Sequence, residues 1–377
     1  MASIANALVV GGGGGGMSAA IQLSRQGVEV TLVERNPDWA PDGAGITLGS
    51  PTLRALREVG VVEEVLARGG HWSAVDIRDA DGQLQATHAL APAIGAEDLP
   101  AAAGILRPEL AGILARATCA AGVQVRLGCE VVRLDQDEGG VDVVLSDGAG
   151  ARYDLVVGAD GVHSSIRRWV LPGFAGPRFS GQGSWRAVVP RTEANSTIYM
   201  GRNIKAGLNP VSQSQCYLFV LDPRKDMDYL PPEQWTTELA GLLAEFGGQV
   251  GRIREGLLDG SLAQARVLYR PLAGHLIPPP WHYGRVVLLG DAVHATTPHL
   301  ASGAGIAIEG ALILAEELRR RHSLDGALAA YAGRHYDRAA LVVTASGLLG
   351  LIEQNAGSHQ EHHRLMVDTL EALRAPL

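Results

Sequence analysis

Short apolar runs recur along the chain, and two of them flank a run of six glycines near its start. Ala7-Leu8-Val9-Val10 precedes Gly11 to Gly16, and the helix-like sequence Met17 to Leu23 follows at once. A second, mainly apolar stretch runs from Val28 to Val33 and ends in Glu34. Runs of this kind are typical of strands buried on both faces of a parallel sheet. The pattern therefore predicts strand, glycine turn, helix and strand.

The glycine run has the spacing of a nucleotide-binding turn. Gly11, Gly13 and Gly16 satisfy G-x-G-x-x-G, which lets the backbone approach a pyrophosphate at a helix N-terminus. A flexible linker is the alternative, but linkers have polar flanks, whereas these flanks are apolar. Glu34 lies where a ribose hydroxyl needs an acceptor, about 20 residues beyond the glycines, and its charge disfavours a 2′-phosphate. FAD or NAD therefore fits better than NADP.

Two later segments return to this pattern. Tyr153 to Arg167 contains an apolar run that ends in Asp160 and a glycine turn, and Arg285 to His294 contains one that ends in Asp291. Strand ends of this kind are where α/β sheets place ligand contacts. After the second run, a glycine-bearing loop at Gly303 to Ile306 is expected to open a helix whose N–H groups can hold an anion.

Other segments predict antiparallel sheet. Val123 to Val132 is expected to be one strand, and turns and a further strand up to Gly148 then suggest a β-meander. From about Leu171 to Pro280, strand-like stretches alternate with charged turns. That segment predicts an antiparallel sheet that forms a lid over the nucleotide site.

Composition narrows the class of partner. The chain has 377 residues, 46% of them hydrophobic, and a net charge of −8 with no long basic block, which argues against nucleic acid and against stable membrane association. Cys119, Cys129 and Cys216 form no metal-ligand spacing and no evident disulfide framework, so a cytoplasmic location is expected.

Together, the motifs carry a family resemblance. Three motifs extend over nearly the whole chain. They are the glycine fingerprint with Glu34, G-A-D-G-x-x-S-x-x-R at Gly158 to Arg167, and G-D-A-x-H at Gly290 to His294 with its downstream P-x-x-x-x-G-x-G. This set resembles the single-component FAD-dependent aromatic monooxygenases of the hydroxybenzoate and salicylate hydroxylase type. The resemblance implies FAD as cofactor, with NAD(P)H, dioxygen and a small aromatic substrate as partners, and it is compatible with a homodimer.

The implied fold class is α/β, or α+β overall. A Rossmann-like FAD-binding domain with a parallel sheet is interleaved with an antiparallel-sheet substrate domain, and C-terminal helices follow. The expected boundaries are 1–75, 104–170 and 281–330 for the FAD-binding domain, 76–103 and 171–280 for the substrate domain, and 331–377 for the helical segment.

The resemblance also implies a cofactor-binding role for each of a set of residues. The glycines face the pyrophosphate, and the acidic strand ends and one arginine face the ribose, ribityl and NAD(P)H-linked parts of the site. The set is Gly11, Gly13, Gly15 and Gly16; Glu34 at the adenosine ribose with Arg35 beside it; Val131 near the adenine; Arg107 and Asp291 at the ribityl chain; Asp160; and Gly303, Ala304, Gly305 and Ile306 under the flavin. Two departures from the family pattern are Glu309-Gly310 and the glycines at positions 12 and 14.

The implied chemistry needs a proton acceptor. In the family, a flavin C(4a)-hydroperoxide transfers oxygen to an electron-rich ring, and a phenolic or hydroxypyridine ring becomes nucleophilic when its proton is withdrawn. His299, just before the loop under the flavin, is the first candidate base, with helix capping or core packing as the alternative. Tyr217 is a second candidate, as a wall residue of the pocket, although aromatic residues in strands are often ordinary core. His294 is expected to brace its loop.

Some charged residues leave alternatives open. Arg186, Arg202 and Lys205 could pair with a substrate carboxylate, or they could be surface charges. His359, His362 and His363 have metal-ligand spacing, but charged residues interleave them and no metal is expected. A flavin dehydrogenase or reductase without oxygen insertion, and a non-catalytic FAD-binding regulator, are the alternative functions. The substrate and the choice of NADH or NADPH cannot be derived from the sequence.

Overall fold

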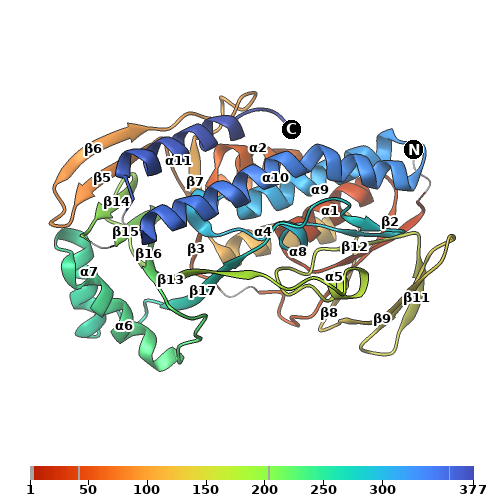
Figure 1. The fold of residues 1–377 in the computed structure, drawn as a ribbon, viewed down its shortest axis with the longest axis horizontal. Coiled ribbons are helices and arrows are strands. Elements are labelled where there is room, and N and C mark those ends of the chain that lie inside the picture. Colours follow the sequence, from red (N-terminus) through yellow and green to blue (C-terminus); the bar gives the residue numbers. More distant parts are fainter. Residues whose placement is uncertain (1–3, 41–42, 203, 356) are drawn as a thin grey trace.

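The computed structural model describes residues 4–40, 43–202, 204–355 and 357–377. Two large sheets lie toward opposite ends of an elongated molecule, and a long C-terminal helix runs along it past both sheets (Figure 1). Within these residues, the first large sheet has the strand order β18-β19-β12-β1-β2-β8, with only the β18–β19 pair antiparallel. Its strands are β18 (His282–Tyr283), β19 (Val286–Leu288), β12 (Leu155–Gly158), β1 (Asn6–Val10), β2 (Glu29–Glu34) and β8 (Gln124–Leu127).

The register of this parallel sheet brings three distant segments to one edge. Val10 pairs with Val33 on one side and with Gly158 on the other, and Gly158 pairs with Leu288. The residues that follow these strand ends therefore emerge together at the carboxyl edge of the sheet. The predicted parallel sheet is confirmed, and the continuous apolar sequence of β1, β12 and β19 matches their buried positions.

Helix boundaries differ from the expected ones at two places. Helix α1 (Gly14–Arg25) begins inside the glycine run, so the last three glycines form its first turn. Helix α9 (Gly303–Arg320) begins at Gly303, so Gly303 to Ile306 are a helical turn rather than a loop. The two helices pack against each other beneath the glycine turn.

One expected strand is wrong. Val123 to Val132 is not continuous, because β8 ends at Leu127 and β9 (Val131–Gln136) starts in another sheet. Between them, Gly128 has a φ of 66°, a left-handed conformation that glycine adopts without a steric penalty. The turn carries the chain from the parallel sheet into the predicted meander, which is completed by β10 (Val141–Leu145) and β11 (Gly150–Tyr153).

The second large sheet is mainly antiparallel, as predicted, and its described strands have the order β17-β13-β16-β15-β14-β5-β6. Helices α6 (Trp235–Leu242) and α7 (Gly248–Leu258), which the sequence analysis did not predict, pack on it and enclose a separate core around Trp185 and Tyr269. The strands are β5 (Ala74–Asp79), β6 (Leu84–Ala89), β13 (Arg178–Pro190), β14 (Ser196–Met200), β15 (Lys205–Pro210), β16 (Gln215–Pro223) and β17 (Leu268–Gly274).

A small sheet and several helices connect the two large sheets. The small sheet has the order β3-β7-β4; β7 contacts β15 of the second large sheet, and β3 contacts α9. The remaining elements are β3 (Gly45–Gly49), β7 (Ala102–Leu106), β4 (Gly70–Trp72), α2 (Ser50–Val59), α3 (Val62–Arg68), α4 (Arg107–Ala120), α5 (Ser165–Val170), α8 (Asp291–His294), α10 (Leu324–Gln354) and α11 (His359–Leu373), with short 3₁₀ turns at Pro232–Gln234, Leu243–Glu245 and Pro298–Leu300.

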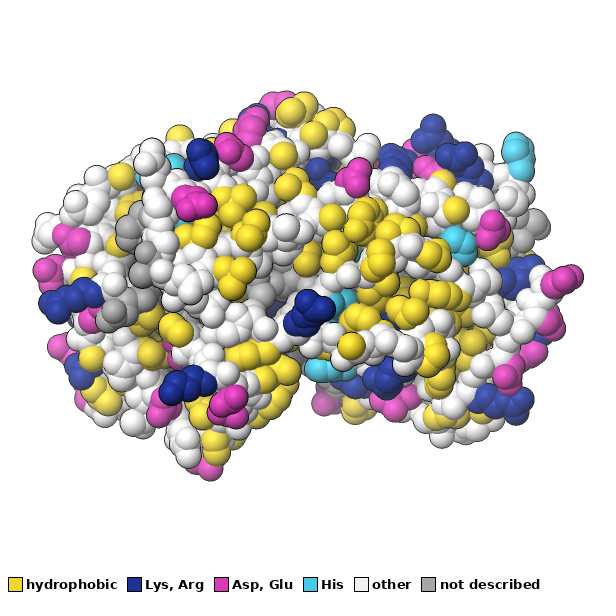
Figure 2. Space-filling model, in the orientation of Figure 1, with side chains coloured by type: hydrophobic (Ala, Val, Ile, Leu, Met, Phe, Trp, Pro, Cys, Tyr) yellow, Lys and Arg dark blue, Asp and Glu magenta, His cyan; other side chains and the backbone are white. Residues whose placement is uncertain are grey.

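The C-terminal helices form a layer along the molecule. Helix α10 packs on α9, and α11 folds back along α10 (Figure 1). In the part of the chain that the structure describes, no helix combines the length and apolar character needed to span a membrane. Hydrophobic side chains gather toward the middle of the face in Figure 2, while charged side chains lie mainly around its rim.

Candidate functional site

The glycine turn forms a cradle at the carboxyl edge of the parallel sheet. Gly11 has a φ of 108°, and a Cβ there would lie 2.3 Å from the carbonyl oxygen of Ala159. A Cβ on Gly16 would lie 2.0 Å from the carbonyl oxygen of Gly11. Gly13 differs, because it is exposed and a Cβ there would meet no protein atom within 4 Å. Two glycines are thus required by the protein itself, whereas Gly13 faces space that a ligand can enter.

Glu34 orients this turn. One oxygen of its carboxylate accepts the Gly12 N–H at 2.7 Å, and the other accepts the Asn36 N–H at 2.8 Å. Each carboxylate oxygen has a second lone pair, so Glu34 can still accept a ribose hydroxyl. Arg35 is exposed beside it, and Val131 is buried at the start of β9.

Asp160 caps a helix. Its carboxylate accepts the backbone N–H of Ser165 at 2.7 Å and that of Ile166 at 3.1 Å, and it also accepts the hydroxyls of Ser164 and Ser165. These groups are the otherwise unpaired donors at the start of α5. The contacts assign Asp160 a structural task at the edge of the sheet, and its expected link to FAD and NAD(P)H stays a prediction.

Asp291 lies at the start of α8 and is exposed, although residues 285 to 290 before it and Ala292 after it are largely buried. Dense protein around the carboxyl raises its pKa to about 6, and the positive charge of Arg107 partly offsets the rise. An acid that is accessible yet poorly solvated is suited to accept hydrogen bonds from ligand hydroxyls.

Arg107, the first residue of α4, connects this edge to a second hollow. Its pKa is lowered to about 10, mainly by burial and also by the charge of Arg186, while Tyr217 and Asp291 partly offset the fall. Its Nε is buried and has no hydrogen-bond partner among the residues that the structure describes. Arg186, Tyr217 and Asp291 are therefore each within electrostatic reach of Arg107, although they come from β13, β16 and α8.

The second hollow has a volume of about 140 Å³ and is lined mainly by arginine and apolar side chains. Arg186 and Ser184 face it from β13, and the Arg186 Nε and Ser184 Oγ are buried without partners among the described residues. Among the described residues, no carboxylate lines it. Its lining residues are Gly43, Ala44, Arg107, Ser184, Arg186, Leu268, Arg270 and Leu272.

Tyr217 is a buried wall residue beside this hollow. Its hydroxyl lies 2.6 Å from the Thr47 hydroxyl and accepts the Asn209 side-chain N–H at 3.2 Å. Its ring covers Gly45, where a Cβ would lie 2.2 Å from the Tyr217 ring. A phenol that is already hydrogen-bonded to Thr47 and Asn209 is held in one orientation. Sequence reasoning did not find Thr47 or Asn209, because neither belongs to a motif.

His299 is buried rather than open to the hollow. Its side chain is 1% exposed, Nδ1 lies 2.9 Å from the Thr297 hydroxyl, and Nε2 lies 3.3 Å from a carboxylate oxygen of Glu353. Glu353, on α10, also pairs with Lys205 and with His362. These cationic and donor groups hold the pKa of Glu353 far below its usual range despite burial. The sequence analysis did not single out Glu353, because a lone acid in a helix carries no motif.

His294 lies behind the site. It is fully buried, its ring is 5.3 Å from the ring of His335, and neither of its nitrogens has a partner among the described residues. Burial holds its pKa well below 6.5 and lowers that of His335 to about 4. His335 lies 2.9 Å from the carbonyl oxygen of Ile306, in the first turn of α9. Neutral histidines therefore support the helix start, in keeping with the bracing role expected of His294.

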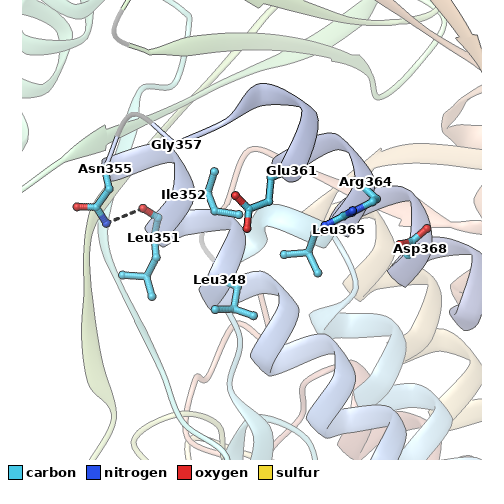
Figure 3. Close-up of a pocket in the computed structure, with 9 residues that line it drawn as sticks. All are labelled: Leu348, Leu351, Ile352, Asn355, Gly357, Glu361, Arg364, Leu365 and Asp368. Atoms are coloured by element: carbon cyan, nitrogen blue, oxygen red, sulfur yellow. Dashed lines mark hydrogen bonds between the residues drawn. The ribbon is translucent and has the colours of Figure 1, made fainter.

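Another hollow lies away from these residues. A surface groove of about 470 Å³ lies between the end of α10 and the start of α11, where apolar residues such as Leu348 and Leu351 face Glu361 and Arg364 (Figure 3). It contains none of the predicted site residues, so it is not the candidate site. Over the described residues, no group of His, Cys, Asp and Glu side chains is arranged to hold a metal.

The residues at the sheet edge fit a flavin dinucleotide. The glycine turn leaves no room for side chains at Gly11 and Gly16, and Gly13 is exposed, which suits a phosphate. The carboxylates of Glu34 and Asp291 suit the ribose and ribityl hydroxyls of such a ligand. Over the described chain there is one such cradle, in keeping with the single fingerprint in the sequence. Fold and site therefore define a flavoprotein oxidoreductase with one dinucleotide site.

Comparisons with known proteins support the assignment to FAD-dependent oxidoreductases. A family model described as "FAD binding domain" matches residues 5–346. The chain is 33% identical over 344 residues to YetM of Bacillus subtilis, described as a candidate FAD-dependent monooxygenase, covering 90% of this chain and 91% of YetM. It is 31% identical over 317 residues to the 2-heptyl-3-hydroxy-4(1H)-quinolone synthase of Pseudomonas aeruginosa, covering 82% of this chain and 79% of that enzyme.

A solved structure extends the match to the fold. HpxO of Klebsiella pneumoniae, complexed with FAD and uric acid, superposes with a TM-score of 0.81 and 26% identity, covering 98% of this chain and 92% of HpxO. The chain belongs to the FAD-binding-domain family and, within it, to the group A FAD-dependent aromatic monooxygenases. FAD as cofactor, the enzyme class and oxygen-dependent hydroxylation of an aromatic ring are thereby confirmed.

Proposed function

We propose that the substrate is a small, planar phenolic or hydroxypyridine-type ring with an anionic group, and that NAD(P)H is the reductant. The arginine-lined hollow carries this proposal. Arg107 and Arg186 have buried Nε atoms without partners among the described residues, and no described carboxylate lines the hollow. A buried guanidinium group with an unsatisfied donor is costly, so an anionic ligand group is the expected counter-charge.

The site's own residues divide the remaining tasks. Arg186 and Ser184, on one strand and facing one side, can hold a planar anion by paired N–H and O–H donation. The fixed Tyr217 hydroxyl can orient a ring hydroxyl, and apolar residues such as Ala44 and Leu268 exclude water. FAD, when bound, supplies the oxygen-activating chemistry, and the protein supplies position and dryness.

The proton acceptor is proposed to act through His299. Its ring is buried, so a proton from the substrate would reach it through Thr297, whose hydroxyl lies 2.9 Å from Nδ1. The neighbouring Glu353 carboxylate stabilises the imidazolium that would form. A helix-positioning role alone is the alternative, and it predicts equal effects of His299→Ala on flavin reduction and on hydroxylation.

The names of two relatives support a planar ring substrate. One relative is a quinolone synthase, and an FAD-dependent urate hydroxylase of Klebsiella pneumoniae is 29% identical over 346 residues. Both names refer to ring compounds with oxygen substituents. The homodimer and the cytoplasmic location stay predictions.

A substrate screen with labelled dioxygen tests the proposal. Hydroxybenzoates, salicylates and hydroxypyridines, each with and without a carboxylate, are compared for stimulation of NAD(P)H oxidation and for labelled oxygen in the product. The proposal expects label in a product from a carboxylated ring and weaker stimulation by its neutral analogue. Stimulation by neutral rings alone would contradict the anionic-group assignment. Turnover without label under any acceptor would favour a dehydrogenase.

A further inference from the structure

Trp39 has an unusual backbone conformation beside the glycine turn. It lies in the turn after β2 with a φ of 48°, in the left-handed region that bulky residues rarely adopt. Such a conformation persists only where the surroundings hold it. Two contacts do so: the indole N–H donates to the Gly12 carbonyl at 3.0 Å, and the Asn36 side chain donates to the Ala40 carbonyl at 2.9 Å.

Trp39 explains why position 12 is glycine. A Cβ on Gly12 would lie 2.3 Å from the indole nitrogen of Trp39 and 3.1 Å from the Cβ of Glu34. Gly12 is not among the glycines with positive φ, so its backbone would accept a side chain. Glycine is therefore required at position 12 by the indole and not by the backbone conformation. Position 12 is one of the two places, with position 14, where glycine departs from the family fingerprint.

Gly12, Glu34 and Trp39 form a closed hydrogen-bonded unit. The Gly12 N–H donates to Glu34 at 2.7 Å, and the Gly12 carbonyl accepts the Trp39 indole N–H at 3.0 Å. Both polar backbone groups of this glycine are thus satisfied by side chains. The indole is partly buried against the main core and stands beside the acid expected to receive the adenosine ribose.

We infer that Trp39 is a cofactor-positioning residue that fixes the glycine turn and forms a wall at the adenosine end of the FAD site. An aromatic ring beside a ribose acceptor gives an adenosine a surface to pack on. Without the indole, the turn has to be ordered when the ligand binds, which lowers affinity. The inference rests on FAD as cofactor and is independent of the ring that the enzyme hydroxylates.

Titration of the flavin-free protein tests this role. Trp39→Ala should weaken FAD binding about tenfold or more, since a packed aromatic contact and a hydrogen bond are lost. ADP, which carries the adenosine half alone, should lose affinity to a similar degree. Trp39→Phe keeps the ring without its N–H and measures the hydrogen bond's share. Unchanged FAD and ADP affinity in Trp39→Ala would overturn the inference, and if that variant does not fold, unchanged affinity in Trp39→Leu, which removes both the ring and its N–H, would do so.

A double-mutant cycle isolates the contact between the two residues. Gly12→Ala alone should weaken FAD binding because its Cβ displaces the indole, and Gly12→Ala combined with Trp39→Ala should bind better than the sum of the two losses predicts. Strictly additive losses would mean that the indole does not position the turn. Trp169→Ala, a tryptophan that is 40% exposed on α5, is the matched control and should bind FAD as the wild type does.

Discussion

The two hollows of the site are built in opposite ways. At the carboxyl edge of the parallel sheet, backbone makes the binding surface, and one short segment, Gly11 to Gly16, supplies most of it. In the arginine-lined hollow, side chains make the surface, and Arg107, Arg186 and Leu268 come from three elements far apart in the chain.

The difference follows from what each hollow must recognise. A pyrophosphate is common to all FAD enzymes and can be held by backbone N–H groups at a helix start. A substrate's identity has to be read by side chains, whose directions depend on sheet register. Substitutions in the glycine turn should therefore abolish FAD binding, whereas substitutions in the arginine-lined hollow should change which substrates the enzyme prefers.

The largest effect is expected from Gly11→Ala. Its Cβ would overlap backbone atoms of Ala159, and its φ of 108° disfavours any side chain, so the free energy of unfolding should fall by about 3 kcal/mol or more. The purified protein should hold no FAD. Gly13→Ala is the matched control: chemical unfolding of its flavin-free form should match the wild type within about 1 kcal/mol, while its FAD affinity falls. A Gly13→Ala variant with full FAD affinity would show that position 13 does not face the ligand.

Asp291→Ala should give the next largest effect. The accessible carboxylate is expected to accept ligand hydroxyls, so FAD affinity should fall by about 10- to 100-fold, measured by flavin content and titration. Retention of full flavin content would contradict this role.

The pKa of Asp291 also predicts how the flavin-free protein responds to pH. Because this pKa is raised to about 6, the folded protein binds a proton more tightly than the unfolded chain does. The contribution of Asp291 to stability is therefore most favourable below pH 4, and it declines as pH rises toward 6. Asp291→Asn should remove that decline in unfolding experiments across this pH range.

Arg186→Met tests the side-chain hollow. It should leave the FAD content unchanged and lower kcat/KM for an anionic substrate by about 100-fold, as expected for a lost charge-assisted contact. The loss for a neutral analogue should be smaller. Arg202→Ala, at an exposed position near the start of β15, is the control and should change neither value. Equal losses for charged and neutral substrates would assign Arg186 a structural role.

The last effect is confined to acid pH and concerns the buried histidines behind the cradle. His335 has a pKa of about 4 in the folded protein, below its ordinary 6.5, so its contribution to stability is fully present above pH 6.5 and is lost as pH falls toward 4. His335→Gln should reduce the slope of unfolding free energy against pH in this window by about one proton, or about 1.4 kcal/mol per pH unit. His322→Gln, at an exposed position, should leave the slope unchanged.

Sequence reasoning found the backbone hollow and only part of the other one. The ends of β1, β12 and β19 were predicted correctly because apolar runs that stop at a glycine or an acid are local signals. The break at Gly128 was missed, since the apolar pattern continues across it and only the left-handed φ reveals the turn. Trp39 was missed because no local pattern shows that its indole folds back onto Gly12.

The sequence by itself determined the cofactor and the family, and it predicted the sheet edge at which FAD is expected to bind, because glycine spacing and apolar runs encode backbone geometry over short distances. Tertiary structure alone decided the roles of the charged side chains. Among cations that looked equivalent in sequence, Lys205 pairs with Glu353, Arg202 is exposed, and Arg186 faces the hollow. Strand register and helix packing set the position of each of these side chains, and both depend on residues that are distant from it in the sequence.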